Sequence, residues 1–129
     1  MQIPLTVYKI GGATSFGAGE LTGRNAFLIF AGLFLTGQKN GILAIGVHAG
    51  TPYYDCSPTF IELMSRLLAE HTDGQAKLIA PFLNWSKGDV FQYFLSSNLS
   101  IELTYSCEAG TDPPCGACAS CRDRRALGC

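Results

Sequence analysis

The sequence predicts an α/β protein with a partial parallel sheet, flanking helices and a C-terminal four-cysteine zinc-binding tail. Apolar segments with helix-like and strand-like patterns alternate along residues 25–95, and four cysteines cluster near the C-terminus. Strands that alternate with helices form parallel sheets, because each crossover helix returns the chain to the same end of the sheet. Only two segments resemble strands, whereas an independently stable sheet usually needs three or more. We therefore expect these two strands to form part of a larger α/β sheet.

Length and low charge restrict the class of protein. The chain has 129 residues, of which 47% are hydrophobic and 15% are charged, and its net charge is -1. Soluble proteins average about 25% charged residues, so the surface leaves room for a partner interface. The composition excludes intrinsic disorder as the default state. The near-neutral charge excludes a basic nucleic-acid-binding footprint over the whole chain.

The sequence carries no recognisable targeting or membrane signal. Its N-terminus lacks the basic segment followed by an apolar segment that marks a signal peptide. The longest apolar run covers residues 26–35, whereas a membrane-spanning helix needs about 20 such residues. We therefore expect a cytoplasmic protein without membrane contact. Its cysteines should be reduced and serve metal binding or catalysis rather than disulfides.

The first expected elements are a loop, a buried helix and a buried strand. Residues 1–23 are rich in glycine, which favours a loop. Residues Asn25–Gln38 have a helical pattern that is apolar on nearly all sides, and this predicts burial all round. Residues Ile42–Val47 form a continuous apolar run, typical of a parallel strand covered on both faces. His48 follows that strand, at the end where α/β sites gather.

Two capped helices are expected on either side of a second strand. Ser57 at an N-cap and Pro58 at the first helical position open one helix. Its apolar stripe comprises Phe60, Leu63, Met64, Leu67 and Leu68. The second strand is Lys77–Phe82, after which Ser86 and Asp89 form a capping-box variant that opens another helix. The residues that this helix is expected to bury are Val90, Tyr93, Phe94 and Leu95.

Four cysteines near the C-terminus have the spacing of a metal site, namely Cys107, Cys115, Cys118 and Cys121. Four thiolates so placed surround one Zn²⁺ ion tetrahedrally, and a zinc ion with no open position is structural. An iron–sulfur cluster is the chemical alternative, because C-x2-C-x2-C also occurs in ferredoxin-type sequences. Metal binding would contribute directly to folding of the tail.

Two further cysteines stay unassigned. Cys129 is an alternative metal ligand, but its terminal position favours fraying over ligation. Cys56 precedes a helix start, where the helix dipole would favour a thiolate. Burial as a small hydrophobic side chain is the other interpretation of Cys56.

Four segments, in this order, resemble the 7-cyano-7-deazaguanine synthase (QueC/ExsB) family. They are GRN at Gly23–Asn25, YYDC at Tyr53–Cys56, WSK at Trp85–Lys87 and the tail Cys107–Cys121. The resemblance covers about residues 15–125 and corresponds to the C-terminal half of the family. It implies a Rossmann-like sheet of the PP-loop ATP pyrophosphatase superfamily and a structural zinc. It also implies the ATP-dependent conversion of 7-carboxy-7-deazaguanine and ammonia to the nitrile of queuosine biosynthesis, through an adenylated carboxylate.

The resemblance also implies a set of binding residues and two regions of the chain. Residues 1–104 would form a partial nucleotide-binding-like α/β domain, and residues 105–129 a zinc-binding segment. Nucleotide (ATP with Mg²⁺) and substrate would contact Arg24, Asn25, Asp55 and Lys87. Arg24 offers a fixed fork for phosphate or carboxylate, Asp55 would accept hydrogen bonds from a deazaguanine, and Lys87 suits ATP phosphates. No catalytic residue is assigned.

The chain departs from the family pattern in two places. It contains no SGGxDS phosphate loop, because the superficially similar Gly11–Ser15 lacks the aspartate. The family's SGYPDCR is replaced by TPYYDCSP at Thr51–Pro58. We therefore expect the chain to be incomplete without a PP-loop partner or further copies of itself, and to act on a small deazapurine. The rival hypothesis is a non-enzymatic, zinc-stabilised protein-interaction module.

Overall fold

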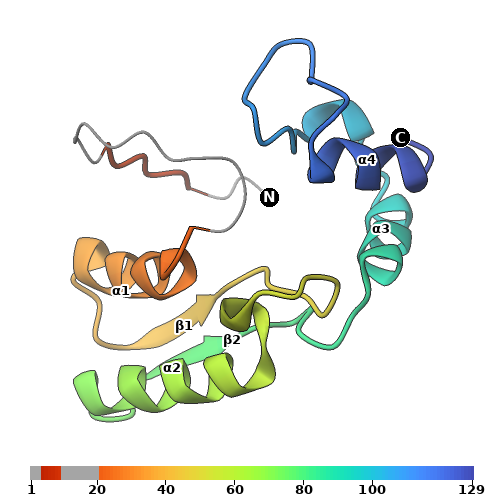
Figure 1. The fold of residues 1–129 in the computed structure, drawn as a ribbon. Coiled ribbons are helices and arrows are strands. Elements are labelled where there is room, and N and C mark those ends of the chain that lie inside the picture. The colour runs from red at the N-terminus through yellow and green to blue at the C-terminus, as the bar shows by residue number, and fades with distance from the viewer. Residues whose placement is uncertain (1–3, 10–20) are drawn as a thin grey trace.

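The computed structural model describes residues 4–9 and 21–129 and confirms the α/β class (Figure 1). Most of the glycine-rich stretch expected as a loop, including Gly11–Ser15, lies outside the described residues. The elements are α1 (Arg24–Thr36), β1 (Gly41–Ala44), η1 (Tyr54–Cys56), α2 (Pro58–His71), β2 (Ala76–Ile79), α3 (Lys87–Ser96), η2 (Ile101–Leu103) and α4 (Ala119–Ala126). Helices and strands alternate from α1 to α3 as the sequence predicted. None of the helices in the described part of the chain is long and apolar enough to cross a membrane.

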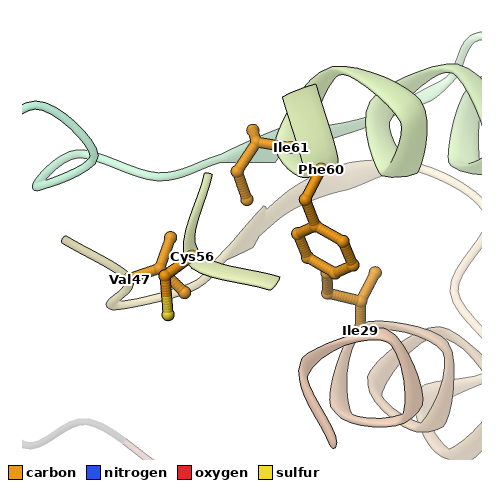
Figure 2. Packing of buried hydrophobic residues seen from close by; sticks show 5 residues of the cluster. All are labelled: Ile29, Val47, Cys56, Phe60 and Ile61. Atoms are coloured by element: carbon orange, nitrogen blue, oxygen red, sulfur yellow. The ribbon is translucent and has the colours of Figure 1, made fainter. Parts of the chain in front are cut away.

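Strands β1 and β2 form a two-stranded parallel sheet, in register from Gly41 opposite Ala76 to Ala44 opposite Ile79. Helix α2 is the crossover between them. Helices α1 and α2 pack against each other on one face of this sheet. Figure 2 shows Phe60 of α2 pointing toward Ile29 of α1, and both belong to one core cluster with Val47, Cys56 and Ile61.

Burial of α1 and β1 differs from the sequence prediction. Only Asn25 and Ile29 of α1 are buried, and Phe34 is 83% exposed. Strand β1 ends at Ala44, and the predicted burial on both faces is wrong, because Ile42 is 71% exposed. The physical reason is that, among the described residues, the helices cover one face of the sheet and leave the other open. Apolar runs that suit a two-sided environment are therefore buried on one side only.

The two predicted helix caps are confirmed. The Ser57 hydroxyl accepts a hydrogen bond from the Phe60 N–H at 3.1 Å, with Pro58 at the first helical position of α2. At α3, the Ser86 hydroxyl accepts from the Asp89 N–H at 3.1 Å, and the Asp89 carboxylate accepts from the Ser86 N–H at 2.8 Å. The Ser86 hydroxyl also donates to the Asp89 carboxylate at 2.7 Å, and this hydrogen bond, followed by that from the Ser86 N–H, lowers the pKa of Asp89. Local chemistry thus fixes where both helices begin.

The predicted apolar faces of α2 and α3 are only partly right. Helix α2 buries Phe60, Ile61 and Leu68, whereas Leu63 and Leu67 of the expected stripe are exposed. The buried face is rotated because α2 packs against both α1 and the sheet. Helix α3 buries none of its residues, and Tyr93 and Leu95 are exposed. It lies beside the C-terminal segment rather than on the sheet (Figure 1).

Candidate functional site

The four predicted metal-binding cysteines come together in the C-terminal segment. The sulfur atoms of Cys107, Cys115, Cys118 and Cys121 all lie within 4.8 Å of one another. Tetrahedral coordination at about 2.3 Å places sulfur atoms about 3.8 Å apart, so a small contraction would seat one metal ion. Cys118 is the N-cap of α4 and Cys121 lies in its first turn. The turn before them uses a left-handed backbone at Gly116, with φ of 70°.

Main-chain N–H groups favour thiolates in this cluster. The Cys115 N–H donates to the Cys107 sulfur at 3.3 Å and lowers the pKa of Cys107 to about 5. The Cys118 side chain accepts from the Cys121 N–H at 3.4 Å. Hydrogen bonding to Cys118, with burial, raises the pKa of Cys121 to about 12. Without a metal, Cys121 therefore keeps its proton near pH 7, and a divalent cation would displace it.

Cys129 is not part of the cluster. Its thiol is exposed and donates to the Arg124 carbonyl at 3.4 Å. The four-cysteine ligand set is thus the one that the spacing predicted. An iron–sulfur cluster uses the same kind of thiolate set, so the geometry alone favours a metal without distinguishing the two.

The arginines after the cluster support its loops. Arg122 donates to the Ala117 carbonyl at 2.7 Å, and Arg125 donates to the Gly116 carbonyl at 3.1 Å. Arg124 donates to the Ile101 carbonyl at 3.1 Å and so ties α4 to η2. Since these guanidinium groups already satisfy main-chain carbonyls, their arrangement favours a structural role.

A second candidate site is a cavity of about 370 Å³ at the carboxyl end of β1. It is lined by Arg24, Asn25, Leu28, Ile45, Gly46, Val47, His48, Thr51, Tyr53 and Cys56. The start of α1, the end of β1 and the loop before α2 thus supply its walls. Ligands of open α/β sheets bind at this end of the strands.

Asp55 forms hydrogen bonds with the start of α1, although it follows Asn25 by 30 residues in the sequence. Its buried carboxylate accepts a hydrogen bond from the Asn25 N–H at 3.3 Å, and its carbonyl accepts from the Asn25 side-chain amide at 3.0 Å. Gly23, the N-cap of α1, has no side chain to fill this role. Asp55 therefore caps α1 and complements its dipole. It stands behind Asn25 and does not line the cavity.

Arg24 is held at the mouth of the cavity. Its Nε donates to the Asn25 side-chain oxygen at 3.3 Å, so Asp55, Asn25 and Arg24 form one chain of hydrogen bonds. The sequence analysis grouped these three residues as ligand contacts, and the structure places them next to one another. Cys56, which lines the same cavity, is buried, with the Asn25 amide 3.8 Å from its sulfur.

Two further polar residues line the cavity. The sequence analysis assigned no role to Thr51 and noted His48 only for its position at the end of a strand. The Thr51 hydroxyl is buried and has no hydrogen-bond partner among the described residues, so a polar ligand would fit beside it. His48 accepts from the Gly50 N–H through Nδ1 at 2.9 Å. Partial burial and the nearby Lys87 charge lower the pKa of His48, which is therefore neutral near pH 7. Thr51 begins the TPYYDCSP segment, and its place in that segment was the sequence feature that could have pointed to it.

Lys87 lies apart from the other three predicted binding residues. Its ammonium forms an ion pair with Asp123 of α4. It lines a different cavity, of about 310 Å³, between α3 and the C-terminal segment. Gly50 lies close to both the His48 ring and the Lys87 main-chain nitrogen, so a side chain at Gly50 would meet both.

Comparison with known proteins identifies the family. Residues 18–127 match the family model described as "Queuosine biosynthesis protein QueC". The chain is 38% identical over 105 residues to a 7-cyano-7-deazaguanine synthase of Aquifex aeolicus, covering 76% of this chain and 48% of the relative. It is 38% identical over 112 residues to that of Synechococcus sp. RCC307, covering 81% and 50%. It is 36% identical over 107 residues to that of Brucella canis, covering 79% and 46%.

The match is confined to one part of these relatives. The chain spans about half the length of the curated relatives it matches, and the matched half is their C-terminal part. No solved structure matches the fold. The family model covers most of the chain, including the Arg24–Asn25–Asp55 group and all four clustered cysteines. The chain is therefore a member of the QueC family.

Proposed function

We propose that this chain is the substrate-binding, zinc-containing half of a 7-cyano-7-deazaguanine synthase. The observation that carries the proposal is the cavity at the end of β1. Arg24 and Asn25 line this cavity, and Asp55 is joined to them by hydrogen bonds from behind Asn25. The relatives named above are 7-cyano-7-deazaguanine synthases. The substrate would be 7-carboxy-7-deazaguanine, with ammonia and ATP as co-substrates in the queuosine pathway.

The proposed chemistry activates a carboxylate. A substrate carboxylate oxygen attacks the α-phosphorus of ATP and pyrophosphate leaves, which gives an acyl adenylate. Ammonia attacks the carbonyl carbon and AMP leaves, which gives the amide. A second adenylation, on the amide oxygen, followed by loss of AMP and a proton, gives the nitrile. Adenylation is needed each time because an unactivated oxygen is a poor leaving group.

Residues of this chain would bind and orient the substrate. The Arg24 fork offers paired N–H donors for the carboxylate or for a phosphate. The Thr51 hydroxyl, which has no partner among the described residues, would hydrogen-bond to the bound substrate. Neutral His48, with Nδ1 engaged by Gly50, would present Nε2–H as a donor. Asp55 acts through Asn25 and Arg24 as a positioning residue.

The metal would be structural. Zn²⁺ bound by Cys107, Cys115, Cys118 and Cys121 supplies no open coordination position, so it would hold the C-terminal segment rather than take part in the reaction. Through α4, which carries both Cys121 and Asp123, it would also fix the partner of Lys87.

ATP phosphates require residues beyond the Arg24 group. We propose that a partner polypeptide supplies the SGGxDS loop, whose N–H groups would hold the pyrophosphate. The rival function, a non-enzymatic zinc-stabilised interaction module, is favoured by one observation. Asp123 already neutralises Lys87, the cation expected on ATP phosphates.

Substrate binding tests the proposal and its rival. Titration calorimetry with 7-carboxy-7-deazaguanine should detect binding to the unmodified chain. Arg24→Ala should weaken this binding roughly 10- to 100-fold, because charge-assisted hydrogen bonds contribute about 1.5–3 kcal/mol. The matched control is Arg66→Ala, which removes an exposed arginine from α2 and should leave affinity unchanged. Equal affinity of both variants, or no binding at all, would favour the interaction module.

A further inference from the structure

Three aromatic side chains cluster around the start of α3, and the proposed function does not use them. The ring centroids of Phe82 and Trp85 lie 5.1 Å apart, those of Phe82 and Tyr93 5.9 Å, and those of Trp85 and Tyr93 5.5 Å. The Trp85 and Tyr93 rings meet edge to face, with an interplanar angle of 79°. Tyr93 is nevertheless 55% exposed. One side of the cluster is therefore open to solvent.

A hollow of about 510 Å³ lies on that open side and is lined by Trp85, Asp89, Gln92 and Tyr93. We call it the α3 hollow. Asp89, Gln92 and Tyr93 share one face of α3, because they are three and four residues apart in sequence. Among the described residues, the α3 hollow shares no lining side chain with the cavity at the end of β1 or with the cavity that Lys87 lines. It is therefore a separate candidate site.

The main chain that carries the Trp85 ring is held on both sides. The Trp85 N–H donates to the Phe82 carbonyl at 2.9 Å, and the Trp85 carbonyl accepts from the Ala49 N–H at 3.0 Å. The capping box of Ser86 and Asp89 then fixes the first turn of α3. A surface that is already ordered loses little conformational freedom when it binds a ligand. The α3 hollow is preorganised in this sense.

Asp89 keeps an acceptor for a ligand. Both hydrogen bonds that its carboxylate accepts from Ser86 end on Oδ2, so Oδ1 retains its capacity to accept. The same bonds lower the pKa of Asp89, and the group is therefore ionised at neutral pH and accepts only. Gln92 is exposed beside it, and its amide can both donate and accept. The polar part of the hollow is thus suited to a ligand edge that carries N–H donors.

This combination of groups suits a guanine-type ring. Flat heterocycles stack on aromatic side chains. A guanine-type ring presents two adjacent N–H donors, which match a carboxylate, and a carbonyl oxygen beside them, which matches an amide N–H. An adenine-type ring presents an acceptor nitrogen beside its amino group, and that nitrogen would face the negative charge of Asp89. Hydrogen bonds to an ionised acceptor are the stronger kind, so the carboxylate should select between the two rings.

The charge of the hollow favours a neutral ligand. Its lining holds the Asp89 carboxylate and, in the described part of the chain, no cation. The nearby Lys87 pairs with Asp123 and lines a different cavity. A phosphate group would therefore meet repulsion. We propose that the α3 hollow binds a neutral guanine-type heterocycle, stacked on the two aromatic rings, with its N–H edge on Asp89 and its carbonyl beside Gln92. This site goes beyond the proposed function, because it is separate from the cavity at the end of β1.

Tryptophan fluorescence reports on this site alone, because Trp85 is the one tryptophan of the chain. Guanosine titrated into the intact chain should quench the emission with saturation, and free tryptophan at the same guanosine concentrations corrects for collisional quenching. Adenosine should bind at least fivefold more weakly, and so should guanosine 5′-monophosphate. A response to guanosine that does not saturate would overturn the proposal. Equal affinity for adenosine, or tighter binding of the monophosphate, would overturn it as well.

Two pairs of variants locate the binding. Gln92→Ala replaces an exposed helical residue by a good helix former, so it should fold and weaken guanosine binding roughly fivefold. Tyr93→Ala removes a stacking ring and should weaken it roughly tenfold. The matched controls are Gln38→Ala, at another exposed glutamine, and Phe34→Ala, at an aromatic residue that is 83% exposed on α1. Both controls should leave the titration unchanged, and equal effects within either pair would overturn the proposal.

Arg24→Ala separates this site from the proposed substrate cavity. The guanosine titration of this variant should equal that of the unmodified chain, because Arg24 lines the other cavity. Loss of the guanosine response in Arg24→Ala would place the ligand in the cavity at the end of β1 and overturn the second site, while the proposed function would stand. Saturable guanosine binding by a chain that does not bind 7-carboxy-7-deazaguanine would support the α3 hollow and count against the proposed function.

Discussion

Replacing Cys121 by serine, or removing the metal with a chelator, should unfold the C-terminal segment and leave the α1–β1–α2–β2 part folded. The only buried residues in 105–129 are Cys107 and Cys121. A segment with so small an apolar core depends on the metal for its structure. Metal content should fall well below one equivalent. Amide protons of α4 should lose protection, while those of α2 keep theirs.

Cys129→Ser is the matched control, because Cys129 is exposed and lies outside the cluster. That variant should retain its metal and an ordered α4. Elemental analysis and the visible absorption spectrum should show colourless Zn²⁺ rather than a brown iron–sulfur chromophore. Full metal retention in Cys121→Ser, or equal losses in both variants, would contradict the assignment of the ligands.

Replacing Asp55 by alanine should lower the free energy of unfolding by about 2 kcal/mol, the loss expected for a helix cap whose removal leaves a buried N–H unpaired. Asp55→Asn keeps an acceptor oxygen for the Asn25 N–H and should cost less. Urea denaturation followed by circular dichroism measures both. The same alanine variant should weaken substrate binding, since Arg24 is positioned through Asn25.

Glu62→Ala provides the comparison for Asp55→Ala. Glu62 is an exposed acid on α2, and surface substitutions of this kind change stability by about 0.5 kcal/mol or less. If Asp55→Ala were as stable as Glu62→Ala, Asp55 would not be a cap. A loss of substrate affinity without loss of stability would instead place its carboxylate on the ligand.

Features set by neighbouring residues were predictable from the sequence. The caps at Ser57 and Ser86 depend on groups three residues away, and the metal cluster depends on short cysteine spacings. The capping of α1 by Asp55 was not predicted, because Asp55 and Asn25 are 30 residues apart in the sequence. The sequence analysis assigned Asp55 to the substrate, and in the structure its carboxylate accepts from the Asn25 N–H.

Burial was the least predictable property. The apolar runs of α1 and β1 indicate environments covered on several sides, and their composition says nothing about which segment provides the cover. In the described part of the chain, Phe34 and Ile42 face outward. An apolar sequence pattern therefore does not determine by itself which side chains are buried.

Product formation tests the proposed function most directly. This chain is mixed with the N-terminal part of the Aquifex aeolicus relative, 7-carboxy-7-deazaguanine, ammonium, ATP and Mg²⁺, and the products are measured by mass spectrometry. We expect 7-cyano-7-deazaguanine together with AMP, and much less of both with Arg24→Ala. The absence of nitrile, under conditions in which the intact Aquifex aeolicus relative produces it, would contradict the proposed function.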